Sequence, residues 1–301
     1  MSLTDTHCHL DLENFDLDRA AVLERAASAG VSHILIPGLD LLSSLSAVKL
    51  AESHPILSAA IGVHPTEAAT WNNSSINELS ALTSGASGAF GASGSSSPSG
   101  TSETLDTPII SKVVAIGEIG LDYYWNSTNQ ELQKDILREQ LDLAARTGLP
   151  VILHMRESKD SQHEQCAGDL LQILETWIAG LHLTKNPLVK QPGVLHSFSG
   201  SLETARHGMR LGFYIGVTGP VTFRNTQARQ EIIAALPLDH ILIETDAPFQ
   251  APHPYRGKRN EPSYVRLIAD KIALLLSRTV EEVAAVTSEN AERLFAWKET
   301  V

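Results

Sequence analysis

Short apolar runs alternate with amphipathic segments along most of the chain. The apolar runs predict strands at a short segment ending in His7-Cys8-His9 and at residues 31–38, 57–65, 113–118, 150–154, 193–196, 212–217 and 240–246. Apolar positions with helical spacing predict helices at residues 17–29, 41–53, about 66–83, 129–147, 169–178, 202–211, 229–236 and 262–297. The chain therefore consists of eight predicted strand–helix units.

The predicted strands are almost continuously apolar, which is typical of a parallel sheet covered by helices on both faces. An open, doubly wound sheet would show the same alternation. The count of eight, together with polar residues at the ends of many strands, favours a closed barrel. We predict a single-domain (β/α)8 TIM barrel that spans residues 1–301.

One segment interrupts this alternation. Residues 84–106 are dominated by Gly, Ser, Ala and Thr, so they cannot bury enough apolar surface to offset the cost of ordering them. We interpret them as a disordered surface insertion without chemistry, and disfavour a domain linker because the strand–helix alternation resumes unchanged. Two polar stretches, residues 157–168 and 183–192, are interpreted as expanded surface loops.

Composition restricts the class of protein. The chain of 301 residues has a formal net charge of −12 and 43% hydrophobic residues, so any nucleic acid would have to be bound locally. Two cysteines imply no disulfide framework and fit a reducing compartment. The sequence shows neither a targeting segment nor a membrane-spanning run. We expect a cytoplasmic protein, with the nucleus as the alternative; a monomer is compatible with the sequence.

Side chains that can bind metals recur where the predicted strands end. A strand alternates its side chains, so His7 and His9 share one face while Cys8 points into the core. An isolated His-x-His pair is usually structural, but here further candidates follow at the ends of other strands. The complete set is His7, His9, His64, Glu118, His154, His196 and Asp246. In a barrel these ends converge on one mouth, where such a set predicts two divalent ions with Glu118 between them.

Two neighbouring ions would lower the pKa of a shared water and hold the oxygens of a phosphodiester. Asp246 could bind an ion and also accept the proton of that water. Glu244 lies on the same strand face as Asp246, so it either supports the metal site or pairs with a basic residue. We take Asp246, Glu118 and Glu244 as the catalytic candidates.

Cations lie on the loops that follow the strands: Arg156, Arg224 and the run Tyr255-Arg256-Gly257-Lys258-Arg259-Asn260. Loop cations are usually solvated, but beside a metal site they suit a phosphate backbone. We assign Arg156, Arg256 and Lys258 to substrate binding, with Tyr255 or Phe249 available to stack on a base.

Six stretches together resemble the TatD family of metal-dependent deoxyribonucleases. They are residues 5–11 (DTHCHLD), 61–65 (IGVHP), 115–123 (AIGEIGLDY), 149–156 (LPVILHMR), 195–200 (LHSFSG) and 242–248 (LIETDAP). The resemblance implies a TIM barrel in which His7, His9, Glu118, His154, His196 and Asp246 hold divalent cations, with Mg²⁺ favoured over Mn²⁺ or Zn²⁺. His64 is then left for substrate binding. The family's activity is hydrolysis of DNA, typically exonucleolytic.

The leading hypothesis is therefore a 3′–5′ exonuclease that acts on single-stranded DNA ends through a metal-activated water. One alternative is the hydrolysis of another ester or amide, such as an aminoacyl-tRNA ester or a cyclic amide, at the same site. A second alternative is a barrel that has lost turnover and serves as a scaffold. The presence of all six expected ligands argues against this last possibility.

Overall fold

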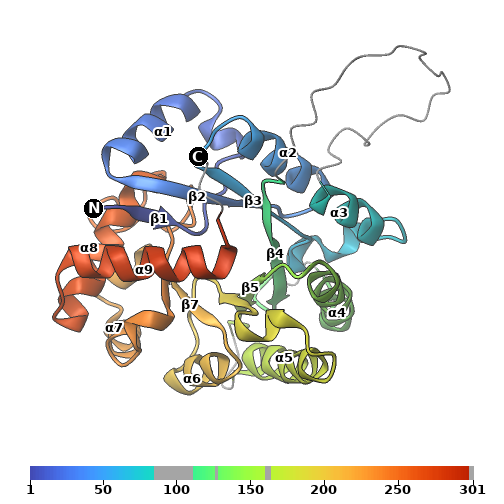
Figure 1. Ribbon diagram of the computed structural model, residues 1–301. Helices are drawn as coiled ribbons and strands as arrows, with labels where there is room; N and C mark the ends of the chain where they lie inside the picture. The colour runs from blue at the N-terminus through green and yellow to red at the C-terminus, as the bar shows by residue number, and fades with distance from the viewer. Residues whose placement is uncertain (85–110, 126–127, 160–163, 298–301) are drawn as a thin grey trace, which may run out of the picture.

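Eight parallel strands form the centre of the molecule, and helices surround them (Figure 1). The computed structural model describes residues 1–84, 111–125, 128–159 and 164–297. The strands pair in chain order: β1 (Leu3–Asp5), β2 (Val31–Pro37), β3 (Leu57–Ile61), β4 (Val113–Asp122), β5 (Val151–Arg156), β6 (Gly193–Leu195), β7 (Tyr214–Val217) and β8 (Ile241–Ile243).

The segments that follow β1 and β8 close the ring. The backbone N–H of Thr6 donates to the carbonyl of Ile243 at 3.2 Å, and Cys8 forms a parallel bridge with Ala247. We call this junction the seam. The predicted (β/α)8 barrel is therefore confirmed, with parallel strands throughout as the apolar runs indicated.

Helices follow the strands in the order α1 (Arg19–Ser28), α2 (Leu41–Glu52), α3 (Ser75–Thr83), α4 (Gln130–Thr147), α5 (Gln165–Leu183), α6 (Leu202–Arg210), α7 (Gln227–Ala234), α8 (Val265–Leu276) and α9 (Val280–Phe295). Short 3₁₀ turns occur at Glu13–Phe15, Pro65–Thr70, Pro187–Lys190, Gly219–Thr222, Leu238–His240 and Pro262–Tyr264.

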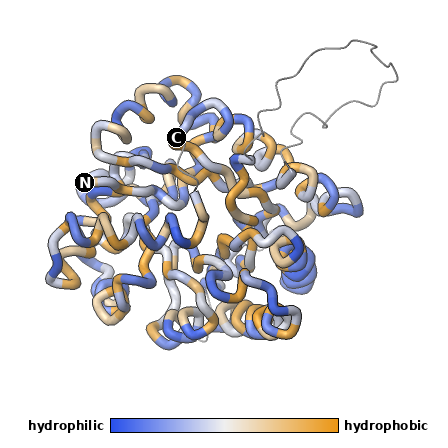
Figure 2. The backbone as a smooth tube through the Cα atoms, in the orientation of Figure 1, coloured by the Kyte–Doolittle hydropathy of each residue, from blue (hydrophilic) through white to orange (hydrophobic). Residues whose placement is uncertain are grey.

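Helix α4 illustrates how the local sequence sets these boundaries. The Asn129 side chain accepts hydrogen bonds from the backbone at the helix start, and Gly148 ends the helix with a positive φ of 71°. Between them, Leu137, Leu141 and Ala144 form a buried face. Figure 2 shows hydrophilic and hydrophobic bands along the outer helices, as expected for helices that pack one side on a sheet.

The amino-terminal end of the barrel is closed by the C-terminal segment. Phe295 and Trp297 pack with the barrel residues Leu35, Ile152 and Leu242 in one apolar cluster. Trp297 also stacks on His33, near the start of β2, with ring centroids 4.8 Å apart. Polar side chains consequently gather at the opposite, carboxyl-terminal end.

Several predicted boundaries were wrong. Helix α5 begins at Gln165 and ends at Leu183, so part of each supposed loop at 157–168 and 183–192 is helical. The helix expected at 66–83 is a 3₁₀ turn followed by α3. The tail 262–297 is not one helix, because Ser277 takes a left-handed conformation between α8 and α9. Strand β4 continues to Asp122, four residues beyond its predicted end.

The predicted insertion at 84–106 lies outside the described residues, except for Ser84 at the end of α3. Among the helices in the described part of the chain, none has the length and apolar character needed to cross a membrane.

Candidate metal centre

The seam brings the first and last site residues together. The backbone N–H of Asp246 donates to the carbonyl of His7 at 2.8 Å, and that of His9 donates to the carbonyl of Ala247 at 2.8 Å. Strand β1 ends at Asp5, before the histidines, but the bridge at Cys8 preserves the alternation. His7 and His9 therefore face the mouth, whereas Cys8 is fully buried in the core.

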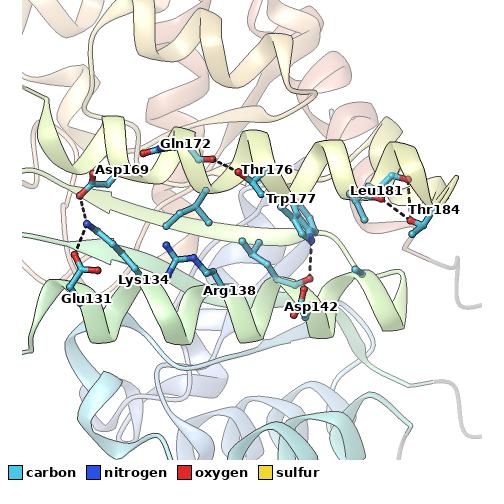
Figure 3. A pocket seen from close by; sticks show the side chains of 14 residues that line it. Glu131, Lys134, Arg138, Asp142, Asp169, Gln172, Thr176, Trp177, Leu181 and Thr184 are labelled. Carbon is cyan, nitrogen blue, oxygen red and sulfur yellow. Dashed lines mark hydrogen bonds and ion pairs between the residues drawn. The ribbon is translucent and has the colours of Figure 1, made fainter.

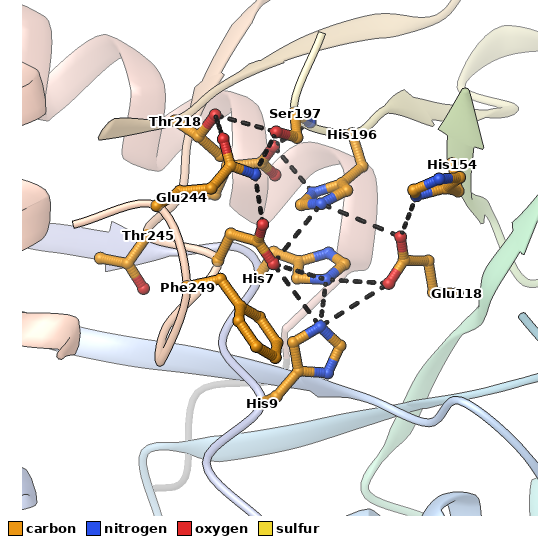
Figure 4. Close-up of polar contacts among 12 residues, drawn as sticks. His7, His9, Glu118, His154, His196, Ser197, Thr218, Glu244, Thr245 and Phe249 are labelled. Carbon is orange, nitrogen blue, oxygen red and sulfur yellow. Dashed lines mark hydrogen bonds and ion pairs between the residues drawn. The ribbon is translucent and has the colours of Figure 1, made fainter. Parts of the chain in front are cut away.

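His7, His9 and Asp246 form a first cluster of potential ligands, which we call the seam triad. The Nε2 atoms of the two histidines lie 3.2 Å apart. Oδ1 of Asp246 lies 3.9 Å from Nε2 of His7 and 3.6 Å from Nε2 of His9 (Figure 4). Three donor atoms thus point at a common centre.

Glu118, on β4, links this triad to a second one. Its Oε2 lies 3.3 Å from Nε2 of His7 and 3.7 Å from Nε2 of His9. Its Oε1 lies 2.8 Å from Nδ1 of His154 and 3.6 Å from Nε2 of His64. We call His64, Glu118 and His154 the strand triad, because its members come from β4, β5 and the segment that follows β3. The two oxygens of one carboxylate therefore face different clusters.

His154 is held between two carboxylates. Its Nδ1 faces Glu118, while its Nε2 lies 3.0 Å from Oδ2 of Asp122. A carboxylate on one ring nitrogen of a metal-binding histidine fixes the orientation of the other nitrogen. Gly120 makes this packing possible, since a Cβ at its φ of +141° would lie 2.1 Å from the His154 carbonyl.

His196 is oriented in the same manner by Glu244. Nδ1 of His196 lies 2.9 Å from Oε1 of Glu244, and its Nε2 lies 3.8 Å from Oδ1 of Asp246 and 3.9 Å from Oε1 of Glu118. The fully buried Glu244 also accepts a hydrogen bond from the backbone N–H of Ser197 at 2.6 Å. Gly216 leaves space for this carboxylate, because a Cβ there would lie 2.2 Å from it. Glu244 thus contacts His196 in the interior.

The hydrogen bonds of His64 define its tautomer. Its Nδ1 accepts from the backbone N–H of Thr66 at 3.2 Å, so in the neutral ring the proton resides on Nε2. Burial is the main reason why the pKa of His64 is lowered to about 3, and the neighbouring His154 adds to it. A neutral His64 therefore directs an N–H donor toward Glu118 and the interior of the site.

The side chain of Asp246 is oriented by Gln250, a residue to which the sequence analysis gave no role. Gln250 Nε2 donates to Oδ2 of Asp246 and, at 2.8 Å, to Oγ of Ser197. Thr218 donates to the amide oxygen of Gln250 at 3.3 Å. These contacts hold Oδ2 away from the centre and leave Oδ1 directed at His7, His9 and His196.

A second buried carboxylate strengthens the seam. Asp5 accepts hydrogen bonds from the backbone and hydroxyl of Thr245 at 2.8 and 2.5 Å. Burial raises the pKa of Asp5 to about 7 even though these hydrogen bonds favour the charged form. Asp5 thereby joins the end of β1 to the segment that carries Asp246.

The electrostatic field of the site favours positive charge. Burial alone would raise the pKa of Glu118, but the surrounding imidazoles hold it well below its usual range. Burial would likewise lower the pKa of His154 and His196, but the neighbouring carboxylates outweigh it and raise these values to about 9 and about 10. The pKa of Asp246 is lowered to about 2, because its imidazole neighbours outweigh burial. Protons here occupy positions that a divalent cation could take.

The donor set fits such a cation. Two atoms bound to one ion at about 2.1 Å lie roughly 3.0–3.5 Å from each other in tetrahedral or octahedral geometry. The separations around the two Nε2 atoms run from 3.2 to 3.9 Å, so the shorter ones fall within this range and the longer ones slightly exceed it. Imidazole with carboxylate suits Zn²⁺ and Mn²⁺ as well as Mg²⁺. All six sequence-predicted ligands therefore lie together, with His64 beside them.

The basic residues of the loops are more dispersed than the sequence indicated. Arg259 is turned away to Asp18, with contacts of 2.7 and 2.8 Å. Lys258 is exposed, and Arg256 lies over the Phe223 ring at 4.5 Å. Tyr255 stacks on Tyr264 with centroids 4.2 Å apart, so one face of its ring is already covered. The expected cluster at 255–260 is therefore split between several directions.

Arg156 and Phe249 lie nearer to the site residues. Arg156 ends β5, two residues after His154, and its guanidinium lies 4.0 Å from the centre of the Tyr124 ring. Phe249 is 52% exposed, and its ring meets the ring of His9 edge-on, with centroids 6.0 Å apart (Figure 4).

A separate cavity of about 620 Å³ lies between α4 and α5, where it shares no residue with the metal centre (Figure 3). Lys134 bridges Glu131 and Asp169 at 3.0 and 2.8 Å along one side. Trp177 donates its indole N–H to the Leu141 carbonyl at 3.0 Å. These polar contacts are satisfied within the helix pair.

A (β/α)8 barrel with potential metal ligands at the carboxyl ends of its strands is typical of metal-dependent hydrolases. Residues 4–296 match the family model described as TatD related DNase, and the chain belongs to the TatD family. It is 37% identical over 293 residues to "Uncharacterized metal-dependent hydrolase YabD" of Bacillus subtilis, covering 97% of this chain and 98% of that protein.

Two further relatives span the chain. The "3'-5' ssDNA/RNA exonuclease TatD" of Erwinia tasmaniensis is 34% identical over 297 residues, covering 97% of this chain and 98% of that protein. The crystal structure of the TatD homologue YjjV from Escherichia coli superposes with a TM-score of 0.81 at 32% identity, covering 98% of both chains. The chain is accordingly a metal-dependent hydrolase of this family.

Sequence reasoning gave no role to Asp122, Asp5 or Gln250. Asp122 could have been found, because it lies four residues after Glu118 on the same strand and period-two alternation places both on one face. Asp5 and Gln250 act across the seam and the neighbouring loops, on partners distant in sequence, and no local pattern reveals such contacts.

Proposed function

We propose that this hydrolase cleaves phosphodiester bonds in single-stranded nucleic acid, releasing nucleotides from the 3′ end of DNA. The observation that carries the proposal is Glu118, whose two oxygens face two separate clusters of ligands. Paired divalent ions, once bound, supply a water of lowered pKa and neutralise phosphoryl oxygens. The relative from Erwinia tasmaniensis, named as a 3′–5′ ssDNA/RNA exonuclease, supports this substrate class.

The residues of the chain have distinct roles in this proposal. His7, His9, His154, His196, Glu118 and Asp246 hold the ions. Asp246, which is anionic at neutral pH because its pKa is about 2, also accepts the proton of the attacking water. The Nε2–H group of neutral His64 donates a hydrogen bond to a phosphoryl oxygen, and Glu244 orients His196.

The loop residues hold the substrate. Arg156 and Arg256 present guanidinium groups at the ends of β5 and beyond β8, and Lys258 adds a third exposed cation. In a chain with a net charge of −12, these cations supply local attraction for phosphates. The exposed ring of Phe249 beside His9 suits stacking with a base.

The proposal is tested with purified protein, several divalent ions and a panel of substrates. We expect Mg²⁺ or Mn²⁺ to support stepwise shortening of 5′-labelled single-stranded DNA, and a chelator to stop it. Duplex DNA, RNA and an aminoacyl ester are compared in the same preparation. If the oligonucleotide stays intact while an aminoacyl ester or a cyclic amide is hydrolysed, the proposal is contradicted and the alternative, an ester or amide hydrolase, is supported.

His64→Ala gives a second readout, since one donor aimed at developing charge contributes on the order of 10²-fold to the rate. The exposed His182 on α5 provides the matched control as His182→Ala. Equal loss of DNA cleavage in both variants would remove His64 from the proposed mechanism.

A further inference from the structure

Two aromatic and two basic residues form a cluster beside the strand triad. Tyr124 and Trp125 lie two and three residues beyond the end of β4, while Arg156 and Lys159 come from the end of β5 and the loop beyond it. The Tyr124 ring lies 4.0 Å from the guanidinium carbon of Arg156 and 4.5 Å from Nζ of Lys159. Trp125 meets Tyr124 edge-on with centroids 4.8 Å apart. We call these four residues the aromatic–basic cluster.

This cluster is attached to the metal centre through Asp122. Oδ1 of Asp122 accepts hydrogen bonds from the backbone N–H groups of Tyr124 and Trp125 at 2.8 and 2.9 Å. Its other oxygen, Oδ2, lies 3.0 Å from Nε2 of His154. One carboxylate therefore orients a metal ligand and also fixes the backbone of the aromatic pair.

Trp125 is unusually exposed for a tryptophan. The residue is 52% exposed, whereas most tryptophans in proteins are largely buried. It also lies beside a polar site. Phe249 shows the same 52% exposure beside the seam triad, and its backbone N–H donates to the Asp246 carbonyl at 2.8 Å. Each triad is thus accompanied by one exposed aromatic ring.

Arg156 and Lys159 restrict the class of ligand that could stack on Trp125. The cation centres of Arg156 and Lys159 lie 5.5 and 5.9 Å from the centre of the Trp125 ring, farther than from Tyr124. A planar ring with two neighbouring cations suits a nucleotide, whose base stacks while its phosphate meets the positive charge. Paired bases in a duplex are stacked on each other, so this arrangement favours an unpaired base.

We propose that the aromatic–basic cluster is a nucleotide subsite, in which Trp125 stacks on the base next to the scissile phosphate on the His154 side. Arg156 and Lys159 contact the phosphate of that nucleotide. The inference rests on the proposed function and extends it, because it assigns a second base-binding position besides Phe249 and explains selection for single strands.

The first experiment measures binding without turnover. A fluorescently labelled oligothymidylate is titrated with wild-type protein, Trp125→Ala and Trp125→Phe in the presence of a chelator. Leu132→Ala is the matched control, because Leu132 is a 40% exposed apolar residue at the start of α4. We expect Trp125→Ala to weaken binding roughly tenfold, Trp125→Phe to restore most of it, and the control to bind as wild type.

The second experiment separates the subsite from the hydrolytic function. Steady-state cleavage of the oligonucleotide is compared with that of bis(4-nitrophenyl) phosphate, which carries no base. Trp125→Ala should raise KM for the oligonucleotide by a larger factor than KM for the small ester. Arg156→Ala should reduce the salt dependence of oligonucleotide binding by about one charge.

The outcomes are distinguishable. Binding that depends on Trp125, without any cleavage, would support the subsite and contradict the proposed hydrolysis. Cleavage with equal affinities for wild type and Trp125→Ala would overturn the subsite and leave the proposed function intact. A wild-type protein that fails to bind the oligonucleotide would also overturn the subsite.

Discussion

The seam triad and the strand triad use similar donor atoms but differ in how those atoms are already paired. In the seam triad, Nε2 of His7 and His9 and Oδ1 of Asp246 face one another at 3.2 to 3.9 Å. In the strand triad, Nδ1 of His154 lies 2.8 Å from Oε1 of Glu118, and the pKa of His154 is raised to about 9. A cation entering the strand triad must therefore displace a proton and a short contact.

The backbone around the two triads also differs. The seam triad is supported by ladder-like hydrogen bonds between the ends of β1 and β8, and by Asp5 and Gln250. The strand triad depends on one additional carboxylate, Asp122. From this comparison we predict that the two triads, although their donor atoms are similar, bind ions with unequal affinity and that the seam triad binds more tightly.

The largest effect should come from the residue common to both triads. Glu118→Gln removes the negative charge between the two clusters, so we expect loss of hydrolysis on the order of 10³-fold and weaker binding of both ions. Activity assays and metal titration of the same protein measure this, with the exposed Glu289→Gln as control. Retained binding of one ion at wild-type affinity would mean that Glu118 serves a single triad.

Metal binding at the strand triad should depend on pH. His154 carries a proton below its pKa of about 9, and Nδ1 must lose a proton to bind a metal ion. Affinity at the strand triad should therefore rise with pH, by roughly tenfold per unit below that pKa. Asp246 and Glu118 outweigh burial and raise the pKa of His9, so binding at the seam triad should also tighten with pH. Titration with Mn²⁺ at pH 6, 7 and 8 measures both affinities, and an affinity at the strand triad that stays constant over this range would contradict the expectation.

Asp122→Asn tests the support of the strand triad alone. The amide no longer fixes the His154 ring as the carboxylate does, and we expect this to outweigh the weaker proton competition that follows from a lower pKa of His154. The weaker ion should therefore bind 10- to 100-fold less tightly, in the usual range for such partners. The stronger ion should be unaffected. If both ions bound more weakly by the same factor, the two triads would be coupled.

Gln250→Ala should have the smallest effect, confined to the seam triad. Asp246 loses the donor on its Oδ2 and gains rotational freedom, but its backbone stays fixed by His7. We expect a several-fold loss of affinity for the tighter ion, since the ligand itself remains. Stepwise metal titration measures this loss, and a change in the weaker ion alone would be inconsistent with the assignment.

Much of the fold follows from the sequence because apolar runs and helix periodicity are local signals. The eight strands and the seven polar residues at their ends were readable in this way. Glu118 and His154 lie close together because β4 and β5 are neighbours in a parallel sheet. Their convergence is observed, whereas their roles as ligands and catalysts stay predictions.

Contacts between distant segments and within irregular loops were not readable. Arg259 belongs to the basic run that was expected to suit a phosphate backbone, but it pairs with Asp18, 241 residues away in the chain. Gln250 reaches Asp246 through a left-handed loop conformation that no amphipathic pattern encodes. Helix α5 was predicted too short because Gly168 and Gly180, near its two ends, are residues typical of helix boundaries, although the helix continues through both.

The central claim is that these side chains hold two ions on either side of Glu118. Anomalous diffraction from crystals soaked in increasing concentrations of Mn²⁺ tests it most directly. We expect a first peak beside Nε2 of His7 and His9 and Oδ1 of Asp246, and at higher concentration a second peak between Glu118 and His154. A single peak at saturation, or peaks remote from Glu118, would contradict the account.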